Sequence, residues 1–285
     1  MLPLIDTHAH YYFRDFDADR ERALARDSAA GVLASVQIGC DEVSSLAAIR
    51  LAQQHPGMYT TVGLHPCDAL QVGRQPRQYA GMEDYVPRGR DWDSLFTVFR
   101  ELIERHPGTV VGVGECGFDR YHDASEALYT AQYESFRRHL ALSREYELPL
   151  VIHSRASTPE LEAFMKEYMR GQGDRFVVHC FSEGAAFARS VTAEPGGYIG
   201  IGGVATYQNA AAVREAIIAA PLERILTETD APFLVPAAYK KTHKRCESAM
   251  MDTVVELIAA LKQVPLEDCA AQLVTNAQRF YGINE

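Results

Sequence analysis

The sequence alternates short apolar runs with amphipathic stretches eight times, and this alternation restricts the fold more than any other feature. Repeated strand and helix units predict a parallel sheet covered by helices. Eight such units in 285 residues predict a (β/α)8 TIM barrel, with residues 1–285 forming a single domain. The predicted strands cover residues 2–10, 32–39, 58–66, 109–114, 148–153, 175–179, 198–202 and 225–230. The predicted helices cover residues 16–30, 44–54, 92–105, 125–146, 159–170, 184–192, 210–220, 246–262 and 266–280.

An open, doubly wound sheet is the alternative architecture for the same alternation. Its usual nucleotide signature is a G-x-G-x-x-G turn after the first strand, and the sequence has none there. Residues 67–91 are less regular and rich in Gly, Pro and Arg. We expect them to form a long surface loop and not a domain boundary, because the alternation resumes after them.

The sequence shows no sign of a targeting or membrane segment. The N-terminus lacks a basic region followed by an apolar run, and no apolar run reaches membrane-spanning length. We therefore expect a soluble, cytoplasmic protein that does not bind membranes. The 6 cysteines are scattered without a C-x-x-C pair, which favours reduced thiols over a structural zinc site or a redox motif.

The formal net charge is −10. This charge argues against broad, sequence-independent nucleic-acid binding, which usually depends on a basic surface. It does not exclude an enzyme that acts on nucleic acid, because metal ions and a few local Arg or Lys residues can reverse the potential of one cleft.

Ionisable side chains follow six of the predicted strands. An H-x-H pair ends the first strand, and residues two apart in a strand point to the same side. Parallel barrel strands all finish on one face, where active sites are built, so these side chains are expected to converge. They are His8, His10, His65, Glu115, His153, His179 and Asp230. The other histidines are expected to be ordinary surface or structural residues, with His243 left open: His55, His106, His122, His139 and His243.

This set of side chains has the composition of a metal centre. Imidazoles and carboxylates in this number are too many for one tetrahedral zinc but suit two ions, although a single ion with open positions remains an alternative. Glu115 lies on the middle strand and is expected to bridge the ions, while Asp230 is expected to bind metal and accept a proton. Histidine ligands favour Zn²⁺ or Mn²⁺ over Mg²⁺. If Mg²⁺ binds instead, water and carboxylates would have to complete its coordination shell.

Six segments carry a resemblance to a known family: residues 6–10 (DTHAH), 62–66 (VGLHP), 114–119 (GECGFD), 152–155 (IHSR), 179–182 (HCFS) and 228–232 (ETDAP). In this order they resemble the successive motifs of the TatD family of metal-dependent hydrolases and deoxyribonucleases. The resemblance extends to residues 275–277 near the end of the chain. It implies a TIM barrel, one or two divalent metal ions and hydrolysis of phosphodiester bonds in DNA.

The resemblance also implies roles for individual residues. One ion would be held by His8, His10 and Asp230, and the other by His153 and His179, with Glu115 between them. His65, Arg155 and Arg245 would contact the substrate phosphate. Glu228 would either support the metal ligands from behind or assist proton transfer. The chain departs from the family pattern at Glu183, where a glycine is usual, and in the loop of residues 243–248.

The leading functional hypothesis is a deoxyribonuclease, 3'-5' exonuclease-like, that cleaves ester bonds at single-stranded DNA ends with a metal-activated water. The altered loops motivate an alternative, in which the same site hydrolyses a small amide, ester or phosphoester. A barrel that binds metal without turnover is the third hypothesis, and the complete ligand set argues against it. No obligate protein partner is expected.

Overall fold

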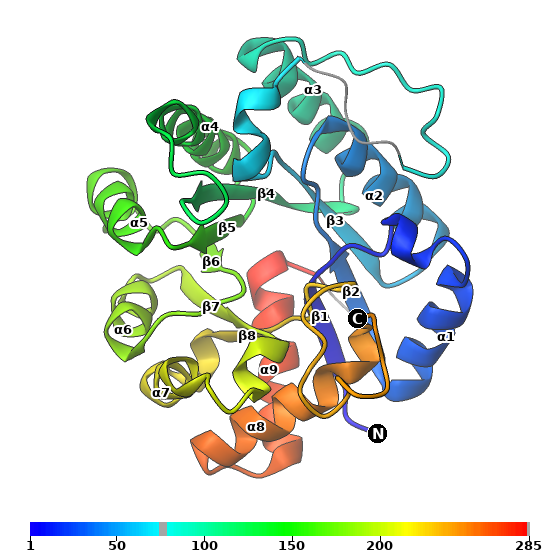
Figure 1. The fold of residues 1–285 in the computed structure, drawn as a ribbon, viewed down its shortest axis with the longest axis vertical. Coiled ribbons are helices and arrows are strands. Elements are labelled where there is room, and N and C mark those ends of the chain that lie inside the picture. The colour runs from blue at the N-terminus through cyan, green and yellow to red at the C-terminus, as the bar shows by residue number, and fades with distance from the viewer. Residues whose placement is uncertain (74–78, 284–285) are drawn as a thin grey trace. The chain divides into compact units, whose positions relative to one another are not determined.

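The computed structural model describes residues 1–73 and 79–283 and has the predicted order of elements. Eight strands alternate with helices along the chain, which is the order of the (β/α)8, or TIM-barrel, class of fold (Figure 1). The predicted fold class is therefore confirmed. Within the described ranges, no helix combines the length and the apolar composition needed to cross a membrane.

The chain divides into two compact units. Unit 1 comprises Met1–Val36 and Val178–Glu285, and unit 2 comprises Gln37–Val177. The elements of unit 1 are β1 (Leu4–Ala9), α1 (Arg20–Ala30), β2 (Val32–Gln37, except its last residue), α6 (Ala185–Ala193), β7 (Gly197–Ile201), α7 (Ala211–Ala219), β8 (Ile225–Thr227), α8 (Asp252–Lys262) and α9 (Leu266–Tyr281). Those of unit 2 are α2 (Glu42–Gln54), β3 (Met58–Val62), α3 (Trp92–Arg105), β4 (Val110–Asp119), α4 (Glu126–Glu145), β5 (Leu150–Arg155), α5 (Thr158–Phe164) and β6 (Phe176–Val178, except its last residue).

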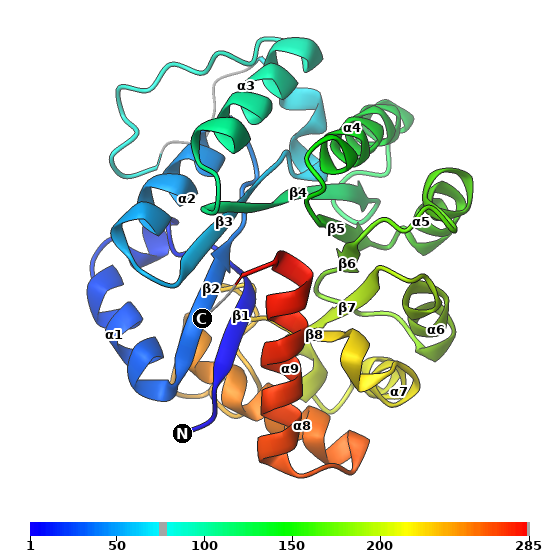
Figure 2. The same cartoon turned by 180° about the vertical axis from the view of Figure 1, so that it is seen from behind.

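In unit 1 the first and last strands are neighbours, as the closed arrangement of strands predicts. The hydroxyl of Thr7 on β1 donates to the carbonyl of Thr227 on β8 at 2.9 Å. Beyond the end of β8, the backbone N–H of Asp230 donates to the carbonyl of His8 at 2.8 Å. The last helix, α9, packs against both strands (Figure 2). Its Tyr281 hydroxyl donates to the Thr7 carbonyl at 3.0 Å.

In unit 2, β3, β4 and β5 pair in parallel. The strand β4 continues to Asp119, five residues beyond its predicted end at residue 114. Gly117 permits this extension: its φ is +134°, and a Cβ there would lie 2.1 Å from the carbonyl oxygen of His153 on β5. Only a residue without a side chain allows so close an approach between the two strands.

Helix boundaries follow local capping signals. Helix α3 has the predicted bounds, since the Asp91 side chain accepts from the backbone N–H of Ser94 and the Ser94 hydroxyl accepts from that of Asp91. The helix predicted for 159–170 is α-helical only to Phe164, and a π-helical turn, η3 (Met165–Met169), follows. The predicted loop 67–91 begins within a short 3-10 helix, η2 (Pro66–Gln71), and its residues 74–78 lie outside the described residues.

Candidate metal centre

The H-x-H pair lies at the carboxyl end of β1, where both imidazoles are buried. His8 is 1% exposed and His10 is 3% exposed. The Nε2 atom of His10 lies 3.2 Å from Oδ1 of Asp230, and that of His8 lies 3.6 Å from the same oxygen. One ligand atom from each of these three residues lies within 4.8 Å of the others, which is the spacing of donors around a cation. The hydroxyl of Tyr12 is 3.1 Å from Nδ1 of His10, so the ring has a second contact that fixes its orientation.

Asp230 follows β8 and reaches His8 and His10 because the chain turns sharply there. Its φ is +58°, a left-handed conformation that aspartate tolerates better than most residues. Burial alone would raise the pKa of Asp230. The hydrogen bond from His10 and the nearby imidazoles of His8 and His179 more than offset burial and hold the pKa below its ordinary value. Asp230 is therefore ionised near neutral pH, which suits both a metal ligand and a proton acceptor.

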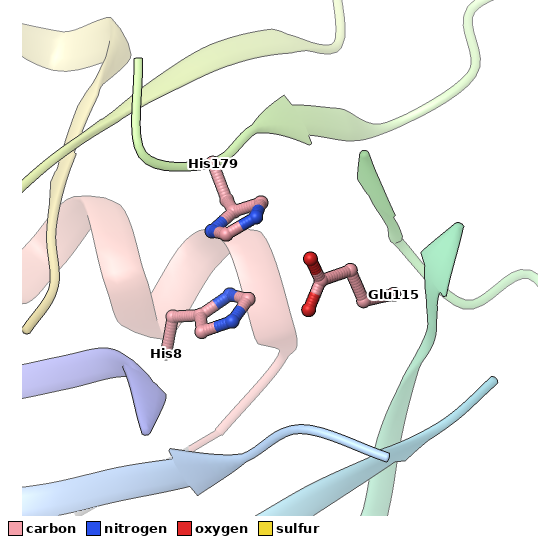
Figure 3. Close-up of side chains that lie close together, drawn as sticks. All are labelled: His8, Glu115 and His179. Carbon is pink, nitrogen blue, oxygen red and sulfur yellow. The ribbon is translucent and has the colours of Figure 1, made fainter. Parts of the chain in front are cut away.

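His179, directly after β6, stacks on His8. Their ring centroids are 3.9 Å apart and the planes differ by 8°, and Figure 3 shows the two rings face to face. Behind His179 lies the buried carboxylate of Glu228, with Oε1 3.6 Å from Nδ1 of His179. That carboxylate also accepts a hydrogen bond from the backbone N–H of Cys180. Glu228 therefore lies beside Nδ1 of His179 and binds the backbone of the residue that follows it.

Asp6, in the DTHAH segment, is a further residue of the site, and its role could not be predicted from sequence. Its side chain is fully buried and accepts from the hydroxyls of Thr229 and Ser248, each at 2.6 Å. It also accepts from the backbone N–H groups of Thr229 at 3.0 Å and of His8 at 3.2 Å. Burial raises the pKa of Asp6 to about 7, although these hydrogen bonds lower it. Asp6 ties the end of β1 to the segment that carries Asp230.

Unit 2 brings together a second group of donors, formed by His65, Glu115 and His153. One ligand atom from each of the three lies within 4.8 Å of the others. Oε1 of Glu115 is 2.8 Å from Nδ1 of His153 and 3.4 Å from Nε2 of His65. The Glu115 carboxylate extends from β4 (Figure 3) and is 2% exposed. His65 follows β3, and its Nδ1 accepts the backbone N–H of Cys67 at 3.1 Å, which leaves Nε2 directed at Glu115.

Asp119, at the end of β4, is the site residue that sequence reasoning missed in this unit. Its Oδ2 lies 3.1 Å from Nε2 of His153, on the opposite side of the ring from Glu115. Burial would raise the pKa of Asp119, but hydrogen bonds from His153 and His122 hold it well below its usual range. The available signal was its position four residues after Glu115 on one strand, which places both carboxylates on the same side.

The predicted phosphate contacts differ in their surroundings. Arg155 is exposed, and its guanidinium carbon lies 4.1 Å from the ring centroid of Tyr121. Arg245 is instead bound by two carboxylates: Nη1 is 2.7 Å from Asp19 and Nη2 is 2.7 Å from Glu247. A contact between Arg245 and substrate stays a prediction.

The donor sets fit a divalent cation such as Zn²⁺ or Mn²⁺. Unit 1 offers imidazoles with the Asp230 carboxylate, and unit 2 offers imidazoles with the Glu115 carboxylate. Nitrogen and oxygen donors of this kind suit borderline cations, and the carboxylate behind an imidazole fixes its ring orientation and raises its basicity. Glu228 and Asp119 occupy such positions behind His179 and His153.

Known proteins resemble this chain over nearly its whole length. The model of the family described as TatD related DNase matches residues 5–282. The protein of Bacillus subtilis (strain 168) named "Uncharacterized metal-dependent hydrolase YabD" is 32% identical over 99% of this chain and 100% of its own length. A protein of Erwinia amylovora named "3'-5' ssDNA/RNA exonuclease TatD" is 28% identical over 94% of this chain and 95% of its own length.

A solved structure gives the same result. The crystal structure of the TatD homolog YjjV from Escherichia coli K12 covers 99% of this chain and 98% of its own, at 26% identity and a TM-score of 0.82. The match of the family model, the identity to YabD and the shared fold agree with the order of the motifs. The chain belongs to the TatD-related DNase family and is a metal-dependent hydrolase that acts on ester bonds.

Proposed function

We propose that this enzyme is a nuclease that hydrolyses phosphodiester bonds at the 3' ends of single-stranded nucleic acid. The observation that carries the proposal is the pair of donor groups, one in each unit, whose members lie in the carboxyl-terminal half of a strand or just after one. In the (β/α)8 class the carboxyl ends of the strands share one face. Paired cations suit phosphodiester hydrolysis because they hold the attacking and the leaving oxygen together.

As the resemblance to the family implies, His8, His10 and Asp230 would hold one divalent ion and His153 and His179 would hold another, with Glu115 as a ligand shared by both. Divalent ions there supply Lewis acidity, which neutralises charge on the phosphoryl oxygens and makes a water molecule acidic near neutral pH.

The protein's own groups place the substrate and move the proton. Asp230, ionised and in contact with His10, accepts the proton of the attacking water. Glu228 and Asp119 hold the rings of His179 and His153 in position. Arg155 and His65 bind the phosphate by charge-assisted hydrogen bonds.

A single-stranded end is the preferred substrate in this proposal for two reasons. Tyr121 is 65% exposed beside Arg155 and His122, which forms an aromatic surface on which an unpaired base can stack. The net charge of −10 disfavours binding along a duplex, whereas an end that enters one cleft needs few basic residues. The Erwinia amylovora relative, named as a 3'-5' ssDNA/RNA exonuclease, supports the same substrate class.

In the test, metal is first removed from the protein with a chelator, and Mg²⁺, Mn²⁺ or Zn²⁺ is then added. Cleavage is compared between single-stranded oligonucleotides labelled at the 5' end and at the 3' end. We expect metal-dependent release of mononucleotides from the 3' end and loss of activity in Asp230→Asn. His243→Asn is the matched control, because this exposed side chain contacts Thr242 and Tyr239 and not the donor groups. Intact oligonucleotides under all three metals would overturn the proposal.

Hydrolysis of a small amide, ester or phosphoester is a second candidate. The surroundings of Arg245 favour this candidate. Its guanidinium, which the resemblance implies would bind a polynucleotide phosphate, is already paired with Asp19 and Glu247. A panel of nucleotides, phosphoesters, lactones and aminoacyl esters decides between the two. Turnover of a small ester at a rate above that of every oligonucleotide would favour this second candidate.

A further inference from the structure

A third group of possible ligands lies in unit 2, outside the residues assigned above to metal binding. Cys67 is in the short helix η2, Asp119 ends β4, and His122 lies in the loop between β4 and α4. Their Sγ, carboxylate oxygen and imidazole nitrogen all lie within 4.8 Å of one another. The set combines a thiol, a carboxylate and an imidazole from two separate segments of the chain.

One distance in this group is already close to that between two ligands of a tetrahedral cation, and a second is shorter. Nδ1 of His122 lies 3.7 Å from Sγ of Cys67 and 2.7 Å from Oδ2 of Asp119. Ligands of a tetrahedral zinc are roughly 3.3 to 3.6 Å apart, as Zn–N and Zn–S bond lengths require. The sulfur already has this spacing. The His122 ring must move outward by about half an ångström, and its side chain is 52% exposed on a loop.

The Asp119 carboxylate is held in place by the backbone. Its Oδ1 accepts from the N–H groups of Tyr121 and His122, each at 2.9 Å. These bonds leave Oδ2 directed at the imidazole of His122 on one side and at that of His153 on the other. The carboxylate is therefore oriented before any cation arrives, which lowers the ordering cost of binding.

We propose that Cys67, Asp119 and His122 form a binding site for a thiophilic divalent cation, Zn²⁺ or its analogues Co²⁺ and Cd²⁺, distinct from the two donor groups of the hydrolytic centre. Thiolate with imidazole selects such ions over Mg²⁺. The cation displaces the proton of the Cys67 thiol, which passes to solvent, and His122 binds the cation through Nδ1 as the neutral imidazole with its proton on Nε2. Water fills the fourth position.

Occupation of this site has a consequence for the neighbouring histidine. Oδ2 of Asp119 is also 3.1 Å from Nε2 of His153. A cation bound to Oδ2 weakens that contact, so the site connects the zinc concentration to the orientation of a residue in the hydrolytic centre. Excess zinc is then expected to slow the enzyme without displacing its other ions.

The first test uses the unaltered protein and the reactivity of its thiols. Cys67 and Cys180 are the two cysteines that are not fully buried, so Cys180 serves as an internal control. Alkylation with iodoacetamide is followed for each peptide by mass spectrometry. We expect Zn²⁺ to slow alkylation of Cys67 by about tenfold or more and Mg²⁺ to leave it unchanged. An equal rate at Cys67 with and without Zn²⁺ would overturn the proposal.

The second test uses Co²⁺ as a spectroscopic probe and does not depend on activity. A thiolate bound to Co²⁺ gives a charge-transfer band in the near ultraviolet, which nitrogen and oxygen donors do not give. We expect the band in the unaltered protein and in Cys180→Ser, its absence in Cys67→Ser, and ~10- to 100-fold weaker binding in His122→Asn. A band that persists in Cys67→Ser would contradict the assignment, whatever the outcome for the nuclease activity.

Discussion

His139 is the buried group whose titration is expected to control the acid stability of this protein. Its ring, on α4, is 0% exposed and lies 4.8 Å from the Phe96 ring, measured between centroids. Nδ1 donates to the carbonyl of Ser135 at 2.7 Å, and Nε2 accepts the backbone N–H of Leu64 at 3.0 Å. The imidazole is therefore neutral, and it satisfies a buried N–H next to His65.

Burial lowers the pKa of His139 from 6.5 to about 4, against the opposing effect of its bond to Ser135. The unfolded chain takes up a proton below pH 6.5 and the folded chain does not. The stability contributed by the neutral ring is therefore complete above pH 6.5 and is lost as the pH falls toward 4. Between pH 7.5 and pH 5 this difference lowers the free energy of unfolding by about 2 kcal/mol.

Two variants separate the titration from the hydrogen bond. His139→Gln offers an oxygen that can accept the Leu64 N–H but does not titrate, so its free energy of unfolding should lose the ~2 kcal/mol pH dependence. His139→Leu also leaves that N–H unsatisfied, which costs about 1–3 kcal/mol more at every pH. Urea unfolding is followed by the fluorescence of Trp92, whose ring is 6.5 Å from Phe96 and which is the only tryptophan in the sequence.

Phe96→Leu is the matched control, because it removes a ring that contacts His139 without changing any titratable group. It should lower the stability equally at pH 7.5 and pH 5. If His139→Gln keeps the same loss between these two pH values as the unaltered protein, then His139 is not the group that titrates and the reasoning is wrong.

In unit 1, Arg245→Gln breaks hydrogen bonds to Asp19 and Glu247, so the free energy of unfolding in urea should fall by about 1–3 kcal/mol while KM stays nearly constant. A large rise in KM at unchanged stability would show instead that Arg245 binds the substrate. Asp230→Asn should lower the hydrolysis rate by ~100-fold or more and reduce the metal content in elemental analysis, and a rate within tenfold of the unaltered enzyme would exclude Asp230 as the proton acceptor. Tyr281→Phe removes the donor to the Thr7 carbonyl and should cost about 1 kcal/mol in thermal unfolding, whereas an unchanged midpoint would show that the bond contributes nothing net.

Helix boundaries were predictable from the sequence where they had a local cause. Asp91 and Ser94 form a capping box, and α3 begins and ends as predicted. The end of β4 was placed too early because the extension depends on a tertiary contact between Gly117 and the backbone of His153. No local pattern encodes the distance to a neighbouring strand.

The donor residues of the site were predictable because each follows an apolar run and the fold class brings such positions to one face. The residues that orient them were harder to predict. Asp119 lies in the GECGFD segment and Asp6 in the DTHAH segment. Their contacts with His153 and Ser248, however, depend on the fold. Cys67 and His122 are 55 residues apart in sequence, so no spacing rule connects them.

Unit 1 is discontinuous in the sequence, and this has a consequence for the time at which the protein can acquire its metal. Asp230 follows His10 by 220 residues. At a typical speed of synthesis, roughly 10 to 45 s pass between the exit of His10 and that of Asp230 from the ribosome. Tyr281, whose hydroxyl on α9 donates a hydrogen bond to β1, leaves the ribosome after Asp230. The nascent chain therefore carries an incomplete set of the proposed ligands throughout this interval, and the ion cannot bind to all three until Asp230 has emerged.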